Sequence, residues 1–266
     1  MRQQIVSFSG GKDSTAMLHM MLERGEDVAA VVFFDWGIEF EEMGPHLEEV
    51  ERKTGIEIVR LYPEHPWRWY FFMPPVRSSR DRPEEGIVKG DIRGYGKGWP
   101  SLQRRWCTTI KVRAMAKWAK AYYPEGVHCI GFADDERHRR NGVTKIKESK
   151  RVRYPLIEYG VTEADALAYC LKLGYRWGGL YDVFDRVSCR LCPLGGIGKA
   201  RLLRKHRPEV WREMMAYDAC RPEHSCTYLG TLDAKTCADL DKRFEREDRV
   251  AADEARQGQL FATEAE

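Results

Sequence analysis

The sequence lacks several features that would place it in a specialised class of protein. No apolar stretch approaches the roughly 20 residues that a membrane-spanning helix needs, and the N-terminus enters a short β-prone segment without a signal-peptide pattern. No internal repeat is present, and neither sign of charge dominates, because 44 basic and 41 acidic residues leave a net charge of +3. These absences argue against a membrane, secreted or repeat protein and favour a cytoplasmic location with no membrane partner.

The composition is that of a globular protein that can bury a core. With 266 residues, 43% hydrophobic and 32% charged, the chain suits one large domain or a domain with an appendage. Its eight cysteines indicate metal or thiol chemistry rather than disulfides in such a protein. Cys129 and Cys170 lie in apolar strand and helix patterns and are expected in the core, and Cys237 has a helical setting without a partner pattern. The remaining cysteines are candidates for chemistry: Cys107, Cys189, Cys192, Cys220 and Cys226.

Strand-like and helix-like segments alternate through the first two thirds of the chain. The patterns predict strands at 4–8, 28–34, 56–61 and 127–131, and helices at 15–22, 44–54, 111–122 and 162–173. Thr162, followed three residues later by Asp165, favours a capped helix start. The alternation predicts an α/β fold with a doubly wound, mostly parallel sheet covered by helices on both faces.

A glycine-containing loop joins the first predicted strand to the first predicted helix. Adjacent glycines let backbone N–H groups turn toward an anion, and the helix N-terminus adds its partial positive charge. The loop is not a Walker A motif, which has four residues between its glycines. It predicts a phosphate site with a cation and two hydroxyls, although a glycine turn with a helix cap is an alternative. Its residues are Ser9, Gly10, Gly11, Lys12, Asp13 and Ser14.

The βα alternation fails in two places. Residues 62–100 form an irregular insertion, aromatic at first and then glycine-rich, which could cover a nucleotide or stack bases, although packing explains most of its aromatics. After residue 185 a helical, cysteine-bearing pattern begins, with helices expected at 200–206, 208–217 and 234–254. We therefore expect an α/β nucleotide-binding domain at 1–185, a helical appendage at 186–254 and a tail at 255–266.

Several segments together resemble a known family. The loop resembles the PP-loop of ATP pyrophosphatases, which split ATP between the α and β phosphates. Four further segments resemble motifs of the phosphoadenosine phosphosulfate (PAPS) reductase family: 33–40, 105–111, 131–137 and 154–165. The resemblance covers most of the first 195 residues and implies an adenine nucleotide alpha-hydrolase-like fold that binds ATP with Mg²⁺.

The resemblance and the chemistry of the side chains together nominate site residues. Asp35 closes a strand at the carboxyl edge of the sheet, where ligands bind in open α/β folds, and it could hold Mg²⁺, orient the nucleotide or cap a helix. Lys12 and Asp13, with Asp35, are the candidate catalytic residues. The candidate nucleotide-binding residues are the six loop residues together with Phe34, Lys111, Gly131, Glu136 and Arg140.

Three cysteines match a cluster-binding pattern of the family. Cys189 and Cys192 form a C-x-x-C pair, which alone suits zinc, a redox dithiol or an iron–sulfur cluster. In the family, such a pair and an upstream cysteine pair hold a 4Fe–4S cluster, but here the upstream pair is reduced to Cys107. A cluster held only by cysteines needs four, so either Cys226 or Cys220 completes the set or one iron stays open. Cys226, in a predicted loop, is the expected fourth ligand, and zinc held by four thiolates is the alternative.

Three activities are compatible with these residues. The first is PAPS or adenylylsulfate reduction, which uses a cysteine in a C-terminal tail. Residues 257–266 of this chain contain no cysteine. Reductases also tend to have a degenerate PP-loop, whereas the loop of this chain is intact. A nucleotide-binding subunit that acts only inside a larger complex, like the small subunit of sulfate adenylyltransferase, is a second reading.

The favoured reading is ATP-dependent sulfur insertion. In this scheme an oxygen of the substrate is adenylylated, pyrophosphate leaves, and sulfur delivered through the cluster displaces AMP. tRNA 2-thiocytidine synthetases and the ATPases of DNA phosphorothioation are similar enzymes. Basic loops and the aromatic insertion suit a nucleic-acid substrate, and a sulfur donor such as a cysteine desulfurase is expected as a partner.

Overall fold

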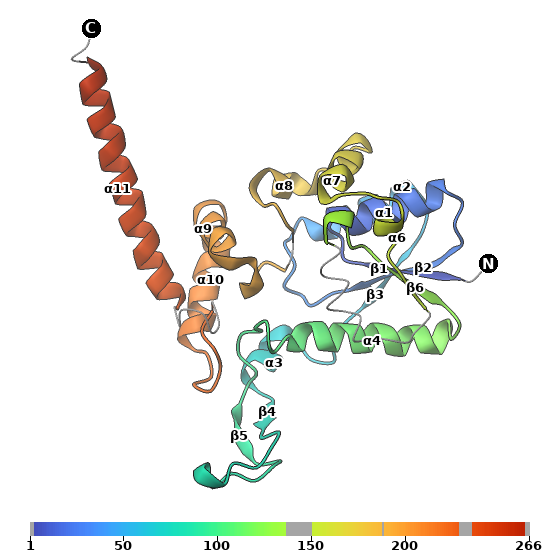
Figure 1. Ribbon diagram of the computed structural model, residues 1–266, viewed down its shortest axis with the longest axis horizontal. Helices are drawn as coiled ribbons and strands as arrows, with labels where there is room; N and C mark the ends of the chain where they lie inside the picture. The colour runs from blue at the N-terminus through green and yellow to red at the C-terminus, as the bar shows by residue number, and fades with distance from the viewer. Residues whose placement is uncertain (1–2, 137–150, 188, 229–235, 264–266) are drawn as a thin grey trace. The chain divides into compact units, whose positions relative to one another are not determined.

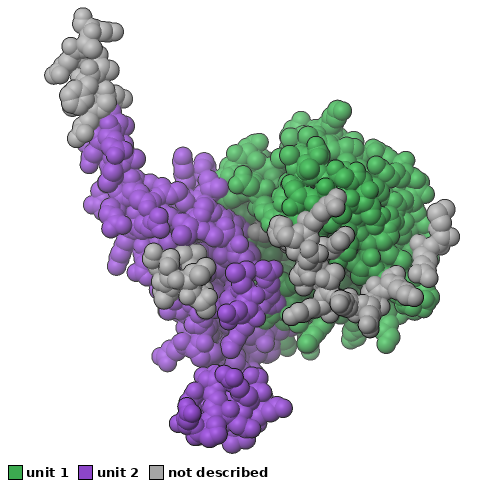
Figure 2. Space-filling view, viewed as in Figure 1, with its two compact units in different colours: residues 1–67, 106–190 green, residues 68–105, 191–266 purple. Residues whose placement is uncertain are grey.

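The computed structural model describes residues 3–136, 151–187, 189–228 and 236–263, with the backbone alone from 257 onward. The chain divides into two compact units. Unit 1 consists of Met1–Trp67 and Trp106–Arg190, and unit 2 of Arg68–Arg105 and Leu191–Glu266 (Figure 2). The expected boundary at residue 185 therefore differs from the observed one, because most of the irregular insertion belongs with the C-terminal helices.

Unit 1 is built on a five-stranded sheet in the order β3-β2-β1-β6-β7. All four strand pairs are parallel, so the carboxyl ends of the strands share one edge. The central strand β1 is apolar on both faces, and Ile5, Val6 and Phe8 are buried. The strands are β1 (Gln4–Phe8), β2 (Val28–Phe34), β3 (Ile58–Leu61), β6 (Val127–Ile130) and β7 (Val152–Arg153).

Helices cover both faces of this sheet, as the alternation predicted (Figure 1). On one face lies α4 (Trp106–Tyr122), whose Met115 and Ala119 pack against Ile5 and Val32 of the sheet. This helix begins five residues before its predicted start, so Cys107 and Lys111 lie in its first turns. The helices of the other face are α1 (Lys12–Glu23), α2 (Met43–Thr54), α6 (Pro155–Glu158), α7 (Glu163–Lys172) and α8 (Leu180–Val183). The predicted capping box of Thr162 and Asp165 is present at the start of α7.

Unit 2 combines the insertion with the C-terminal helices. The insertion, predicted to be irregular, contains α3 (Trp67–Phe72), which begins at the last residue of unit 1, and an antiparallel hairpin of β4 (Pro75–Arg77) and β5 (Ile92–Tyr95). The helices are α9 (Gly196–His206), α10 (Pro208–Ala219) and α11 (Cys237–Thr263). Because α11 continues to Thr263, the expected tail from residue 255 is helical over most of its length. None of the described helices combines the length and apolarity needed to span a bilayer.

A buried carboxylate explains why the insertion folds with the C-terminal helices. Asp218, near the end of α10, is 2% exposed. It accepts hydrogen bonds from the Trp99 indole (2.8 Å) and from the backbone N–H of Cys237 (2.7 Å). Three segments distant in sequence therefore meet at one side chain.

Replacing Asp218 with Ala should lower the free energy of unfolding of unit 2 by about 2–4 kcal/mol, because two buried donors lose their acceptor. Urea denaturation followed by tryptophan fluorescence measures this change. Asp253→Ala, an exposed substitution on α11, is the control and should have no effect. Equal midpoints for the two variants would show that Asp218 does not join these segments.

Candidate functional site

The predicted phosphate loop forms a tight turn at the carboxyl end of β1. Gly10 has φ +76°, and a side chain there would also collide with Met43. Gly11 is the N-cap of α1, and no side chain caps this end of the helix. Ser14 Oγ lies 3.0 Å from Ser9 Oγ and donates to the carbonyl oxygen of Gly11 (3.0 Å), so it holds the turn closed. The first N–H groups of α1 consequently point out of a preformed turn, which suits an anion.

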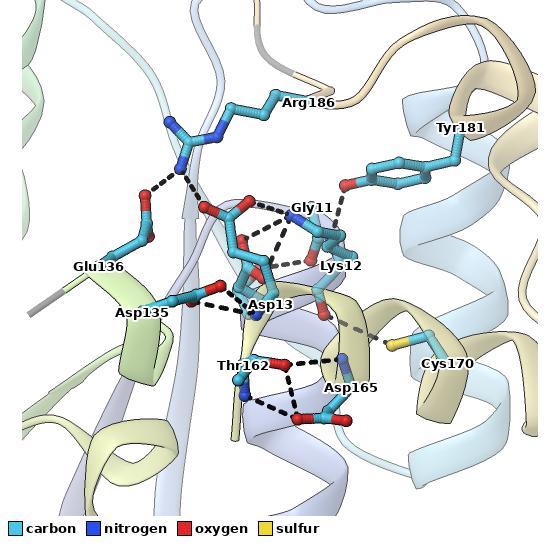
Figure 3. Close-up of polar contacts among 12 residues, drawn as sticks. Gly11, Lys12, Asp13, Asp135, Glu136, Thr162, Asp165, Cys170, Tyr181 and Arg186 are labelled. Atoms are coloured by element: carbon cyan, nitrogen blue, oxygen red, sulfur yellow. Dashed lines mark hydrogen bonds and ion pairs between the residues drawn. The ribbon is translucent and has the colours of Figure 1, made fainter. Parts of the chain in front are cut away.

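The Lys12 ammonium group is buried beside this turn and is paired with carboxylates (Figure 3). Its Nζ lies 2.7 Å from Glu163 Oε2 and 3.4 Å from the nearer oxygen of Asp13. Glu163, the first residue of α7, also pairs with Arg186 (2.9 Å), and Arg186 makes a second ion pair with Glu136. Two cations therefore converge on the loop, and both are held by the chain's own carboxylates.

Glu163 and Arg186 were not predicted as site residues. The backbone N–H of Glu163 donates to Asp135 (3.2 Å), which joins the start of α7 to the segment that follows β6. Glu136, a predicted nucleotide-binding residue, is 4% exposed and lies in the same cluster through its ion pair with Arg186. A basic residue three positions before Cys189 was the only sequence signal for Arg186.

Asp13 is held in an unfavourable environment. Burial, together with the neighbouring Glu163 carboxylate, raises the pKa of Asp13 to about 6 despite the nearby Lys12. Its Oδ1 atom is buried and accepts no hydrogen bond among the described residues. A buried carboxylate with a perturbed pKa beside an anion-binding turn is typical of a functional site.

Aromatic residues pack beside the phosphate loop and hydrogen-bond to it. The indole N–H of Trp177 donates to the carbonyl oxygen of Gly10 (2.7 Å), and Trp177 itself has φ +47°, the only positive value of a non-glycine residue in the described chain. His46 stacks on Trp177 with 4.6 Å between ring centroids and is hydrogen-bonded to Thr15 (3.1 Å). Burial lowers the pKa of His46 to about 3, so the imidazole is neutral at physiological pH.

Tyr181 places an oxygen at the mouth of the loop. Its hydroxyl oxygen accepts a hydrogen bond from the backbone N–H of Lys12 (2.7 Å). An oxygen atom thus already lies on an amide where a phosphate oxygen is expected. Together with the two cations, this geometry suits phosphate oxygens at the N-terminus of α1.

The other predicted nucleotide-binding residues differ in their placement. Gly131 follows β6, and a Cβ there would lie 3.2 Å from the backbone N of Ser14, so a larger residue would press on the start of α1. Phe34 is buried, which leaves only its backbone for a ligand. Lys111 makes no hydrogen bond or ion pair with the cluster in the described chain. Arg140 lies outside the described residues.

Asp35 lies at the same sheet edge as the loop. Phe8 of β1 pairs with Phe33 of β2, so Asp35 and the loop follow neighbouring strands. Its Oδ1 accepts the backbone N–H of Gly37 (2.7 Å), which closes a turn after β2. No described group of three or more potential ligands gathers into a metal site, so the Mg²⁺ and cluster assignments stay predictions.

The cysteines fall into a buried and an accessible class. Cys129, Cys170 and Cys237 are fully buried, and burial raises the thiol pKa of Cys129 and of Cys170 to about 12. The accessible thiols, none of them in a disulfide, are Cys107, Cys189, Cys192, Cys220 and Cys226. The core assignment of Cys129 and Cys170 is confirmed, and the predicted cluster ligands all retain access to solvent.

One predicted cluster ligand, Cys189, and the residue before another, Trp106, contact the same loop of unit 1. Cys189 donates to Glu39 (3.4 Å), and the N–H of Arg190 donates to the carbonyl oxygen of Ile38 (2.9 Å). Trp106, which precedes Cys107, packs edge-on against Trp36 of the same loop (5.8 Å). The other two, Cys192 and Cys226, belong to unit 2. Thiolates of this accessibility suit iron or zinc.

Replacing Asp13 with Asn should raise the free energy of unfolding at pH 7.5 by about 1–3 kcal/mol. The carboxylate has a higher pKa in the folded than in the unfolded chain, so its ionisation destabilises the fold as pH rises from about 4 through 6. The gain should therefore be largely lost at pH 3, below the unfolded pKa, where Asp13 is mostly protonated in both states. Urea denaturation at the two pH values measures it, with the exposed Asp185→Asn as control. A gain that does not change with pH would contradict the assignment.

Comparison with known proteins places these features in a family. Two curated relatives from Methanocaldococcus jannaschii, both described as uncharacterized, are MJ0066 and MJ0973. MJ0066 is 28% identical over 216 residues, which cover 79% of this chain and 40% of the relative. MJ0973 is 23% identical over 215 residues, covering 78% of this chain and 45% of the relative. The chain thus spans less than half the length of either.

A solved structure is also similar. It is the U34-tRNA thiolase NcsA from Methanococcus maripaludis with its 4Fe–4S cluster, at 15% identity and a TM-score of 0.40, covering 90% of this chain and 80% of that one. Residues 3–194 match the family described as the phosphoadenosine phosphosulfate reductase domain. The chain therefore belongs to the phosphoadenosine phosphosulfate reductase domain family.

Proposed function

We propose that this protein binds ATP, cleaves it to AMP and pyrophosphate to adenylylate an oxygen of its substrate, and supports replacement of that oxygen by sulfur. The observation that carries the proposal is the intact turn at Gly10, with the Lys12 ammonium group beside it and the N-terminus of α1 directly after it. Such a turn binds phosphate oxygens through backbone amides and a fixed cation.

The groups around the loop suit attack at the α-phosphorus. The substrate oxygen forms a bond to that phosphorus while the bond to the β-phosphate oxygen breaks and pyrophosphate leaves. Lys12 and Arg186 neutralise the developing charge of the leaving group, and Glu163, which holds both cations in the free chain, must release them. Tyr181 gives up the Lys12 amide to a phosphate oxygen. In the second step a sulfur nucleophile bonds to the activated atom, and AMP leaves with the original oxygen.

The accessible thiols are the proposed ligands of an iron–sulfur cluster. Cys107, Cys189 and Cys192 match the family pattern, and we propose Cys226 as the fourth ligand. Cys226 lies in a loop of unit 2 with its Sγ 3.6 Å from the Trp99 carbonyl oxygen. When bound, the cluster would supply an iron that can carry inorganic sulfide, and a persulfide donor would provide that sulfide together with a thiol reductant that supplies the two electrons needed. The proposed acceptor is a nucleic acid.

The burial of Cys237 argues against PAPS or adenylylsulfate reduction, which needs an accessible thiolate. Apart from the cysteines considered as cluster ligands, which include the exposed Cys220, Cys237 is the remaining candidate nucleophile outside the predicted core. Its side chain is fully buried, and burial together with the neighbouring Asp218 carboxylate raises its pKa far above the ordinary value. A neutral, enclosed thiol is a poor nucleophile.

Replacing Lys12 with Ala should lower AMP and pyrophosphate formation by about 10²–10³-fold, because one fixed donor at the leaving group is lost. The measurement uses ATP labelled in the α-phosphate with Mg²⁺, and total RNA or sheared genomic DNA as acceptor probes. Lys172→Ala, which removes an exposed lysine of α7, is the matched control and should retain full activity. Formation of ADP and orthophosphate by the unmodified protein would refute the proposal.

Serine substitutions should separate cluster ligands from core cysteines. Cys107→Ser, Cys189→Ser and Cys192→Ser should lose iron and sulfide from anaerobically purified protein, together with broad visible absorbance. Cys129→Ser and Cys170→Ser should retain both and lose only stability.

The fourth ligand has its own pair of variants. Cys226→Ser should lose iron, whereas Cys220→Ser should retain it. The reverse outcome would make Cys220 the ligand, and a colourless protein that contains zinc would refute the iron–sulfur assignment.

A further inference from the structure

The outer face of α4 carries an unusual set of side chains. The helix contains four basic residues and no acidic residue. Met115 and Ala119 face the sheet and are buried, whereas the opposite face is exposed along its length. The exposed residues of this outer face are Thr109, Val112, Arg113, Ala116, Lys117, Lys120 and Ala121.

Three cations form a row at the centre of the outer face. Arg113, Lys117 and Lys120 are spaced i, i+4 and i+7, which places them on one side of an α-helix over about 10 Å. None of the three makes a hydrogen bond or an ion pair with another described side chain. By contrast, Arg204 on α9 is paired with Asp241 (2.7 Å) and Asp248 (2.7 Å) of α11. The charges on α4 are therefore not neutralised within the described chain.

We propose that the outer face of α4 binds the phosphate backbone of a double-helical nucleic acid. A duplex carries about one charge per 1.7 Å of its axis at regular intervals along a stiff rod, so it matches a rigid, straight row of cations. Small side chains beside the row, such as Ala116, leave room for a backbone to approach. Tyr122, an exposed aromatic residue of α4, is the last residue of the helix and lies about 180° around its axis from Arg113. The row itself therefore offers no ring that could stack on an unpaired base, which argues against a single strand.

This inference rests on the proposed function, since it names the surface that holds the nucleic-acid substrate. The same helix carries Cys107, a proposed cluster ligand, and Lys111 in its first turns. A duplex that binds along α4 therefore contacts the same helix that carries the proposed cluster ligand Cys107. Because backbone contacts carry no sequence information, this face positions the substrate rather than selecting its sequence.

The test is the salt dependence of duplex binding by the full chain without ATP. A fluorescent DNA duplex of 20 base pairs, about the length of two helical turns, is titrated at several salt concentrations. The triple variant R113A/K117A/K120A should bind about 10- to 100-fold more weakly near 0.1 M salt. Its slope of log affinity against log salt should be smaller by about 2–3, because each lost phosphate contact removes about 0.9.

The control is K172A/K205A/K242A, which removes the same charge from exposed positions on α7, α9 and α11. It should keep the affinity and the slope. Equal weakening of both variants, or no change in R113A/K117A/K120A, would overturn the proposal. A preference of the unmodified protein for the matched single strand or for anionic lipid vesicles over the duplex would also overturn it. Duplex binding is measured separately from nucleotide chemistry. K12A should lose AMP formation and still bind the duplex, so the two proposals can fail independently.

Discussion

The buried ion pair between Lys12 and Glu163 is the interaction on which the site depends. It joins the first residue of α1 to the first residue of α7, so the two helix N-termini lie side by side at the loop. The ammonium group is 4% exposed, and an unpaired charge there would be strongly destabilising. Glu163 therefore substitutes for an anionic ligand in the free chain. Under the proposed function, a phosphate takes the place of Glu163 at Lys12, and nucleotide binding is then an exchange of partners around a fixed cation.

Several groups around the loop are held in states that cost stability. Asp13 is a buried carboxylate with a raised pKa, and Trp177 has a backbone conformation that L-residues rarely adopt. His46 is enclosed and neutral, with its Nδ1 lacking a hydrogen bond in the described chain. Such costs persist because β1, α1 and the segment around Trp177 are packed together, and they are concentrated where the sequence pattern predicts phosphate binding. This agreement between strain and motif supports a functional rather than a structural role for the turn.

Local sequence was sufficient for some parts of the fold and insufficient for others. The strand, turn and helix around Gly10 were predictable because their pattern lies in adjacent residues. Arg186 and Glu163 were missed because tertiary packing alone brings them to the loop. The insertion was assigned to the wrong unit for the same reason, since the hydrogen bond between Trp99 and Asp218 joins residues far apart in the chain. The metal ligands could be nominated only by family resemblance, because spacing alone does not distinguish zinc from iron.

Whether a basic side chain is already paired with a carboxylate, rather than the net charge of the protein, determines which surface attracts a polyanion. A net charge of +3 suggests little, and the basic loops drew attention in the sequence. In the described chain, however, Arg82 is paired with Glu85, and Arg153 with Glu26 and Glu158. Carboxylates bound in this way reduce the field that a distant phosphate experiences. The cations of α4 lie on a helix that has no acidic residue, so their field is not cancelled by neighbours on the same element. Among the residues that the structure describes, a regular helix rather than a loop thus presents the row of charge best suited to a rigid polyanion.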